Sequence, residues 1–501
     1  MSLAASHHRF LAGSAIPTYP IDWEAIVGIS RTIATLQVVV NAKLMRGETV
    51  RENAYRAFRE LDAEYVRFVP WFPYPHQSVA ELEPPTATAT SWDFTHVDPP
   101  TLDFLEATKG RNPIVNFSTI PGWMFVDGQP DYPADPREIL FPYNLGVDLV
   151  DPSGRQVGDY FKRLVAWYTK GGFTDELGVF HKSGYHYELP IWEVLNEADV
   201  EHHMTPKAYT ERYDVIVNAI REVSPATEFV GLGLALPSEA PEYFEYFLDP
   251  ANHSRDVPID WISYHFYATP VLTEKFEDWQ HSLLAQADGF ISTVRFVEAI
   301  RKRLSPSTRT MINEVGIILA EDAIGGADNS SPIPPGYWNL AGALSAHLLI
   351  ELTRIGIDVV GESQLVGYPG QYPSVSMVGW ETGMPNARFR ILQLIRESIV
   401  AGDVLVQDPI GLALNGNARV LGIPDHLPFV HDGQRRVLLV NRSGDTAFTA
   451  LPGAEGGMIH VVDTDSAGGS IRVSPVKSQR VELGPFAVAC VRFPRTDDAV
   501  S

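Results

Sequence analysis

Short hydrophobic runs alternate with amphipathic stretches from about residue 36 to residue 400, and eight of each can be counted. The runs are rich in β-branched and aromatic residues and predict strands, whereas apolar positions at three- and four-residue spacing predict helices. The predicted strands are 36–40, 64–70, 113–118, 189–197, 227–232, 259–267, 308–314 and 357–362. Eight strand–helix units in succession are typical of a (β/α)8 barrel, an α/β fold.

Capping signals mark the start of two of the expected helices. Thr205 is followed by Pro206, a cap residue before a proline at the first helical position. Thr49 and Glu52 have the spacing of a capping box, which predicts a helix that runs to about residue 61.

Helical periodicity ends after about residue 402. Short apolar runs then alternate with turns rich in Gly, Asp and Ser, which predicts a small antiparallel β-sandwich. The first 35 residues are ambiguous, and one more strand of the sandwich could come from them. We therefore expect an N-terminal segment at 1–35, a barrel at 36–401 and a β-sandwich domain at 402–501.

Acidic residues outnumber basic ones by 62 to 39, which gives a formal net charge of −23. This charge repels nucleic acid phosphates and anionic lipid headgroups, so neither nucleic acid nor a membrane is expected as a partner. No window approaches the roughly 20 consecutive apolar residues of a membrane span. The sequence leaves open whether the chain forms a homo-oligomer.

The first residues lack a basic stretch followed by an apolar segment, so a cytoplasmic location is expected. A secreted or periplasmic protein trimmed of its leader would look the same. The single cysteine, Cys490, lies in an apolar run, so an intrachain disulfide is excluded and a buried structural thiol is expected.

Two of the predicted strands end in a carboxylate, Glu197 after Asn196 and Glu314 after Asn313. The C-terminal mouth of the strands is where barrel enzymes keep their chemistry. Cleavage of a glycosidic bond needs one protonated carboxyl group and one ionised one in the same cleft. A single glutamate after a strand usually only pairs with Arg or Lys at a barrel rim, but the combination favours a catalytic pair.

The residues before Glu197 leave an alternative open. Strict alternation along a strand puts Glu193 and Glu197 on one side and Asn196 on the other, so Asn196 and Glu197 both face the cleft only if the strand end is kinked. Glu193 is the alternative catalyst. It lies deeper in the run, where a buried and paired carboxylate is the more usual role.

Neighbouring strands supply further candidates. His265 and Tyr267 lie on the same face of their strand, and a tyrosine hydroxyl can donate a hydrogen bond that keeps a carboxylate ionised. Arg67, near the end of the second strand, could do the same for a nucleophile. The alternatives are that His265 and Tyr267 are a packing pair and that Arg67 only links layers of the barrel.

Taken together, these motifs resemble glycoside hydrolase family 39, which belongs to a clan of barrel glycosidases with catalytic glutamates on strands four and seven. The likeness covers about residues 30–400, and an appended β-sandwich is also usual in the family. It is carried by Asn196-Glu197 at the end of segment 192–197, His265-x-Tyr267 in segment 263–267, Asn313-Glu314, and segments 65–68 and 92–98.

The resemblance implies that Glu197 is the general acid/base and Glu314 the nucleophile, and that Asn196 contacts the sugar hydroxyl next to the anomeric carbon. His265 and Tyr267 would line the first sugar subsite. The reaction would retain anomeric configuration, with carboxyl groups about 5 to 5.5 Å apart. No metal or organic cofactor is implied.

One departure from the family puts the identity of the sugar in doubt. The family's β-xylosidases carry an aromatic residue at the end of strand eight, where this chain has Glu362 within segment 361–364, with Trp380 following later. Glu362 either binds a sugar hydroxyl or is a rim residue. Four tryptophans are candidates for stacking on sugar faces, with core packing as the alternative for each: Trp71, Trp123, Trp338 and Trp380.

The sequence thus predicts a retaining glycoside hydrolase that cleaves terminal sugars from oligosaccharides or glycosides, with a β-xylosidase-like activity. The alternatives are an α-L-iduronidase, β-glucosidase, arabinosidase or galactosidase, and a catalytically silent barrel that binds carbohydrate. His202-His203 does not change this reading, because adjacent histidines cannot chelate a metal as a pair on one helical face does.

Overall fold

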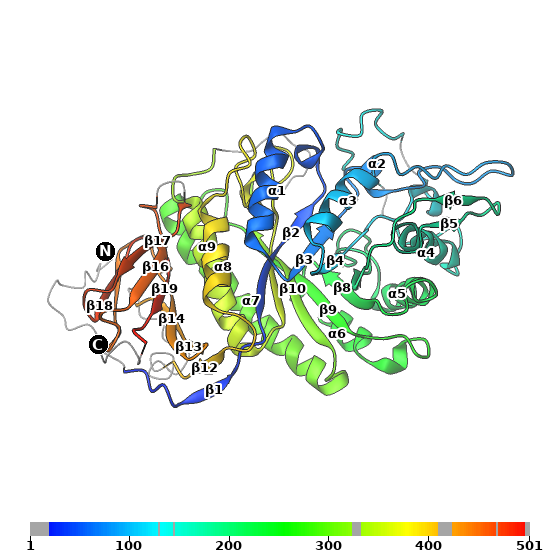
Figure 1. Ribbon diagram of the computed structural model, residues 1–501. Helices are drawn as coiled ribbons and strands as arrows, with labels where there is room; N and C mark the ends of the chain where they lie inside the picture. Colours follow the sequence, from blue (N-terminus) through cyan, green and yellow to red (C-terminus); the bar gives the residue numbers. More distant parts are fainter. Residues whose placement is uncertain are drawn as a thin grey trace, which may run out of the picture.

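A computed structural model describes residues 20–128, 131–143, 146–322, 332–408, 423–466 and 469–495 of the chain. Parts of the two expected terminal regions, 1–35 and 402–501, lie outside the described residues. Figure 1 shows a barrel with its surrounding helices and, beside it, a domain built from the C-terminal strands.

The central element is a closed barrel of eight parallel strands, in which the last strand pairs with the first. This confirms the predicted (β/α)8 fold. In barrel order the strands are β2 (Ile33–Val39), β3 (Tyr65–Val69), β4 (Asn112–Val115), β7 (Ile191–Glu193), β8 (Glu228–Leu234), β9 (Trp261–Ala268), β10 (Arg309–Ile317) and β11 (Val359–Glu362).

Helices connect the strands on the outside of the barrel (Figure 1). They are α1 (Thr49–Leu61), α2 (Pro75–Ser78), α3 (Asp98–Ala107), α4 (Arg155–Thr169), α5 (Pro206–Arg221), α6 (Glu242–Phe247), α7 (Phe276–Leu304), α8 (Tyr337–Ile355) and α9 (Ala387–Ser398). Short additions are the 3₁₀ turns Ala42–Leu44, Gly122–Met124, Pro250–Asn252 and Pro373–Val375, and the hairpin of β5 (Gly172–Thr174) with β6 (Phe180–Lys182).

Both helices with a predicted capping signal are present, and α1 ends at Leu61 as predicted, but only one of the two caps is confirmed. The Thr205 side chain accepts a hydrogen bond from the Ala208 N–H at 3.2 Å at the start of α5. At α1, however, the residue before the helix is Glu48, and its side chain makes no capping bond. Thr49 is the first residue of that helix, and a residue with helical backbone geometry cannot serve as the cap.

The C-terminal domain is a seven-stranded sheet, in the order β1-β12-β13-β14-β19-β16-β17, with a separate pair β15-β18. Strand β1 (Ile26–Ile29) precedes the barrel in the chain and pairs with β12 (Val404–Val406). The others are β13 (Asp425–His431), β14 (Gln434–Val440), β15 (Ala447–Ala450), β16 (Met458–Val462), β17 (Arg472–Pro475), β18 (Arg480–Leu483) and β19 (Val488–Arg492). Cys490 is buried in β19 as a free thiol, as predicted.

Helices α8 and α9 join the two domains, because they contact the barrel strands on one side and β14 and β19 on the other. One continuous apolar core accordingly includes residues of both, such as Leu344 on α8 and Leu438 on β14. None of the helices in the described part of the chain combines the length and the apolar character needed to cross a bilayer.

Candidate active site

A pocket opens at the C-terminal mouth of the barrel strands. Its wall contains both predicted catalytic residues, Glu197 and Glu314, together with the predicted Asn196 and Tyr267. The remaining lining residues are Gln37, Val39, Val69, Trp71, Ile318, Ser363, Gln364, Tyr372 and Val375.

The chain bends sharply where the fourth barrel strand was expected to continue. Strand β7 stops at Glu193, and the backbone at Leu195 (φ 63°) and Glu197 (φ 44°) is left-handed. Residues other than glycine rarely adopt this backbone conformation outside turns, and it ends the alternation of side chains along a strand. The predicted strand 189–197 was therefore too long, and the kink brings Asn196 and Glu197 to the pocket together.

Glu314 reaches the pocket in another way, within a strand that continues past it. Strand β10 runs to Ile317, and its register against β9 shifts between Ile312 and Glu314. A bulge of this kind re-aims a side chain at the rim of a barrel. The shift sets Glu314 opposite His265 on β9.

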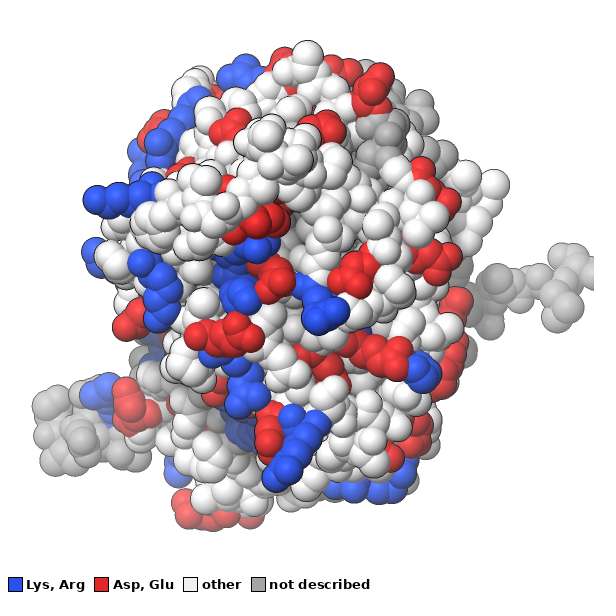
Figure 2. All heavy atoms as spheres, turned by 90° about the vertical axis from the view of Figure 1, so that its right-hand side faces the viewer, with Lys and Arg blue, Asp and Glu red and all other residues white. Residues whose placement is uncertain are grey.

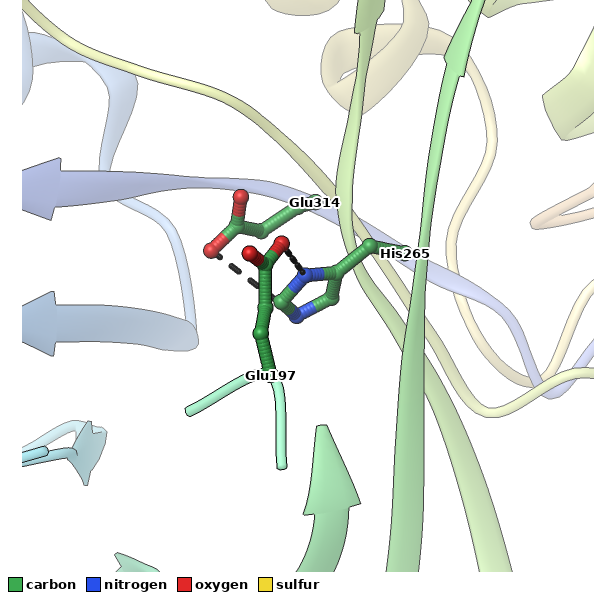
Figure 3. A group of neighbouring side chains, drawn as sticks. All are labelled: Glu197, His265 and Glu314. Atoms are coloured by element: carbon green, nitrogen blue, oxygen red, sulfur yellow. Dashed lines mark hydrogen bonds and ion pairs between the residues drawn. The ribbon is translucent and has the colours of Figure 1, made fainter. Parts of the chain in front are cut away.

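Glu197, Glu314 and His265 converge on one point, as Figure 3 shows. One side-chain oxygen of each glutamate and a ring nitrogen of the histidine all lie within 4.8 Å of one another. His265 Nδ1 is 2.9 Å from Glu197 Oε1, and its Nε2 is 3.8 Å from Glu314 Oε1. His265 itself is buried behind the pocket wall rather than lining it.

Glu314 is surrounded by hydrogen-bond donors. Arg67 Nη1 donates to its Oε1, and the Tyr267 hydroxyl donates to its Oε2. Burial by itself would raise the pKa of Glu314, but the charges of His265 and Arg67 and these two hydrogen bonds outweigh it and hold the pKa below its ordinary value. Glu314 is therefore ionised at neutral pH.

Glu197 has fewer donors. Burial raises its pKa; the hydrogen bond and the charge of His265 oppose that shift, and the negative charges of Glu314 and Asp199 reinforce it. The pKa of Glu197 is raised overall, so this carboxyl group holds its proton to higher pH than its neighbour does. Its side chain is 19% exposed, which leaves it open to the pocket.

Glu193, the alternative catalyst, is a buried and paired group. It pairs with Arg67 and accepts hydrogen bonds from Asn116 (2.6 Å), Ser263 (2.5 Å) and Asn313 (2.7 Å). Its side chain is fully buried, so it cannot reach a substrate.

Five of the seven predicted substrate-binding residues lie outside the pocket wall: Arg67, His265, Glu362, Trp123 and Trp380. Glu362 is buried and forms an ion pair with Arg388 of α9 at 2.6 Å, so its carboxylate is already engaged. Trp123 donates its indole N–H to the Glu81 carbonyl at 3.0 Å. Trp380 does not line the pocket, whereas Trp71 does.

A third carboxyl group beside the pocket, Glu201, was not predicted. Its Oε1 accepts hydrogen bonds from Trp71 Nε1 (2.7 Å) and Asn196 Nδ2 (2.9 Å). The sequence signal that could have found it is the spacing of one helical turn after Glu197.

Glu197, His265 and Glu314 also have the spacing of three metal ligands. Arg67 and Tyr267, however, already direct hydrogens at both oxygens of Glu314. A guanidinium in contact with the same carboxylate opposes a second cation. This arrangement fits proton transfer and nucleophilic chemistry better than metal binding.

Charged side chains of both signs are spread over the face of the molecule that Figure 2 shows. On the face shown in Figure 2, acidic and basic side chains are interspersed and do not form a continuous basic stripe.

Comparison with known proteins locates the fold among glycoside hydrolases of several families. A glucosidase from Croceicoccus marinus has a TM-score of 0.60 at 15% identity, with 96% of this chain and all of that one covered. A family 39 β-xylosidase from Caulobacter crescentus (TM-score 0.58, 13% identity) and a family 51 arabinofuranosidase from Xanthomonas axonopodis pv. citri (0.61, 11%) each match over 95% of this chain and 99% of their own. At these identities the likeness concerns the fold alone.

A family model matches one segment of the sequence. Residues 429–491 match the C-terminal immunoglobulin-like domain of D-apionate lactonase. The described residues of this segment belong to the C-terminal domain, and none of them lines the pocket. None of the curated proteins is similar enough in sequence to count as a match.

Proposed function

We propose that this protein is a retaining glycoside hydrolase that releases a terminal sugar from an oligosaccharide or glycoside. The observation that carries the proposal is the pair Glu197 and Glu314, which approach within 4.8 Å in one pocket but have oppositely shifted pKa values. Carboxyl groups this close leave no room for a water between them, which favours direct attack by one carboxylate over water activation.

In the proposed reaction, Glu197 donates its proton to the glycosidic oxygen while an oxygen of Glu314 attacks the anomeric carbon. The bond to the leaving group breaks, and a covalent glycosyl ester forms on Glu314. Glu197, now ionised, removes a proton from a water molecule, whose oxygen attacks the anomeric carbon and releases Glu314. Both carboxyl groups return to their starting protonation states.

A neutral sugar suits the pocket better than a uronate, which makes a β-xylosidase-like activity the leading specificity and an iduronidase a weaker one. Among the described lining residues none is Lys or Arg. Arg67 lies just below the wall, but it is fully buried and its donors are engaged by Glu193, Glu314, Gln37 and Asn196. A sugar carboxylate would therefore meet acidic groups without a free cation.

The test is a panel of nitrophenyl glycosides that contains xyloside, glucoside, galactoside, arabinofuranoside and glucuronide, with the first product followed by NMR. We expect turnover of at least one neutral glycoside, with the anomeric configuration of the product retained. An inverted first product contradicts the double displacement. Absence of turnover on every glycoside, together with undiminished sugar binding by Glu314→Ala, favours the silent carbohydrate-binding barrel.

Hydrolysis of a sugar lactone is a second candidate, because residues 429–491 match a domain of D-apionate lactonase. An ionised Glu314 could attack a lactone carbonyl, with Glu197 as the proton donor. The matched segment lies outside the pocket, so we rank this activity second. Titration of the acid released from D-apionolactone, with glycosides as the comparison, separates the two candidates.

A further inference from the structure

Glu201 is a carboxyl group next to the proposed catalytic pair that no step of the reaction uses. Its backbone N–H donates to the Glu197 carbonyl at 2.7 Å, so the two residues lie on one turn. Its Oε1 accepts the hydrogen bonds from Trp71 and Asn196, both of which line the pocket. Its Oε2 is buried and has no hydrogen-bond partner among the described residues.

The direction of these hydrogen bonds follows from the donors. Arg67 can only donate, so the Asn196 atom 2.6 Å from its Nη2 must be the amide oxygen. The amide nitrogen of Asn196 therefore faces Glu201. The Trp71 indole can only donate as well, so Oε1 of Glu201 accepts both bonds and any proton on this carboxyl group must be on Oε2.

The surroundings of Glu201 oppose a negative charge. None of its interactions among the described residues is an ion pair with a cation. Burial raises its pKa well above the ordinary value, and the charges of Glu197 and Glu314 raise it further, against the two hydrogen bonds. Tyr372, also close by, is neutral, because burial above all raises its pKa to about 12. Glu201 is therefore protonated at neutral pH.

We propose that Glu201 is a positioning residue, which as a neutral acid orients the Asn196 amide and the Trp71 indole in the wall of the sugar subsite. With its oxygen held by Arg67 and one hydrogen held by Glu201, Asn196 presents a single remaining N–H to the pocket. That N–H is the donor for the sugar hydroxyl next to the anomeric carbon. The inference rests on the proposed glycosidase function and adds a residue to it.

The test compares Glu201→Gln with Glu201→Ala. The glutamine variant keeps an oxygen that accepts both hydrogen bonds and replaces the O–H by an N–H, so kcat/KM stays within about threefold of wild type at pH 7. The alanine variant frees the Asn196 amide, and we expect kcat/KM to fall about a hundredfold, the scale of a small misplacement of a positioning group. The loss should be mainly in kcat, because hydrogen bonds to this hydroxyl strengthen in the transition state.

A substrate without that hydroxyl separates positioning from a general loss of structure. On the matched 2-deoxy glycoside Asn196 has no hydroxyl to bind, so the loss from wild type to Glu201→Ala should shrink to the share that passes through Trp71. Trp71→Phe removes the indole N–H together with the five-membered ring that carries it, and tests the Trp71 contact. Three outcomes would overturn the proposal. They are an unchanged kcat/KM in Glu201→Ala, a loss in Glu201→Gln as large as in Glu201→Ala, and a loss in Glu201→Ala that is as large on the 2-deoxy substrate as on the parent glycoside.

A second measurement does not depend on turnover. The infrared spectrum of wild type at pH 7 should contain a protonated carboxyl C=O stretch that Glu201→Gln lacks, and absence of this difference overturns the neutral-acid assignment. It also serves if Glu201→Ala does not fold. A wild-type protein that cleaves no glycoside but shows this band contradicts the glycosidase function while keeping the protonation of Glu201.

Discussion

The ends of β7 and β10 both deliver a glutamate to the same pocket, but they treat it differently. At β7 the chain leaves the strand through left-handed residues, and among the described residues the charged donor that Glu197 contacts is His265. At β10 the strand continues, and Glu314 receives hydrogens from Arg67 and Tyr267. The exposed fractions of the two side chains are 19% and 10%, so burial does not distinguish them strongly.

The comparison teaches that the hydrogen-bond donors on neighbouring strands set the pKa values of Glu197 and Glu314 apart. Desolvation raises the pKa of both carboxyl groups, and only at Glu314 do the partners overcome it. In the proposed double displacement, the protein without substrate therefore needs Glu314 in its ionised form and Glu197 in its protonated form. Activity should fall as the pH drops through the lowered pKa of Glu314 and as it rises through the raised pKa of Glu197, which gives a bell-shaped profile.

The largest loss of activity is expected when Glu314, the glutamate on β10, loses its carboxylate. Glu314→Gln keeps the shape of the side chain but abolishes the covalent route, so kcat should fall by about four orders of magnitude or more. Steady-state rates on the best nitrophenyl glycoside measure it. Glu321→Gln, farther along the same connection, is the control and should keep full activity. Residual activity within tenfold of wild type would remove Glu314 from the role of nucleophile.

Replacement of Glu197, the glutamate that follows β7, should cause a loss of activity that depends on the leaving group. Glu197→Gln cannot donate a proton, so kcat should fall about 10²–10⁴-fold on an alkyl glycoside. A dinitrophenyl glycoside needs little protonation, and the loss of its first step should be far smaller. The alkaline limb of the pH profile should also disappear. Equal losses on both substrates contradict the acid role.

Removing a hydrogen-bond donor of Glu314 should bring the pKa values of Glu314 and Glu197 closer together. Tyr267→Phe removes one hydrogen bond that lowers the pKa of Glu314, so this pKa rises and the acidic limb of kcat/KM moves to higher pH. The loss at the optimum should be about tenfold to a hundredfold. Tyr264→Phe on the same strand is the matched control, because the Tyr264 hydroxyl has no hydrogen-bond partner among the described residues. An unmoved acidic limb contradicts the assignment.

The sequence predicted the features that follow from periodicity and topology. Eight alternating units define the barrel, and parallel strands bring Glu197, Glu314 and Tyr267 to one mouth. The sequence also indicated that Glu193 lies deeper in its apolar run than Glu197 does. The buried ion pair of Glu193 with Arg67 agrees with this.

Features that depend on long-range partners were beyond the sequence. The left-handed backbone at Leu195 is not a preference of leucine and is imposed by the packing around it. The sequence left open whether Glu362 binds sugar or lies at the rim, because its partner Arg388 lies on a helix that no local pattern connects to it. Glu201 was missed because its indole donor, Trp71, comes from a loop 130 residues earlier in the chain.

The smallest effect is expected at Glu81, a buried carboxyl group that in the described part of the chain lacks hydrogen-bond donors like those of Glu314. Glu81, in the connection after α2, is fully buried, and neither of its oxygens has a hydrogen-bond partner among the described residues. Burial, with a contribution from the charge of Glu176, raises its pKa from 4.5 to about 8. If donors decide the outcome at the pocket, this isolated group must hold its proton at neutral pH.

The consequence for stability has a definite sign. Between these two pKa values the folded chain binds the proton of Glu81 and the unfolded chain does not, so the contribution of Glu81 to stability is full below pH 4.5 and is lost as the pH rises toward 8. Glu81→Gln stays neutral, and its melting temperature at pH 9 should exceed that of wild type by about 1–3 °C, with a smaller difference at pH 6. Differential scanning fluorimetry measures this shift, and the exposed Glu83→Gln is its control. An equal pH dependence in all three proteins would mean that Glu81 finds a partner or water, and that burial alone does not set its proton.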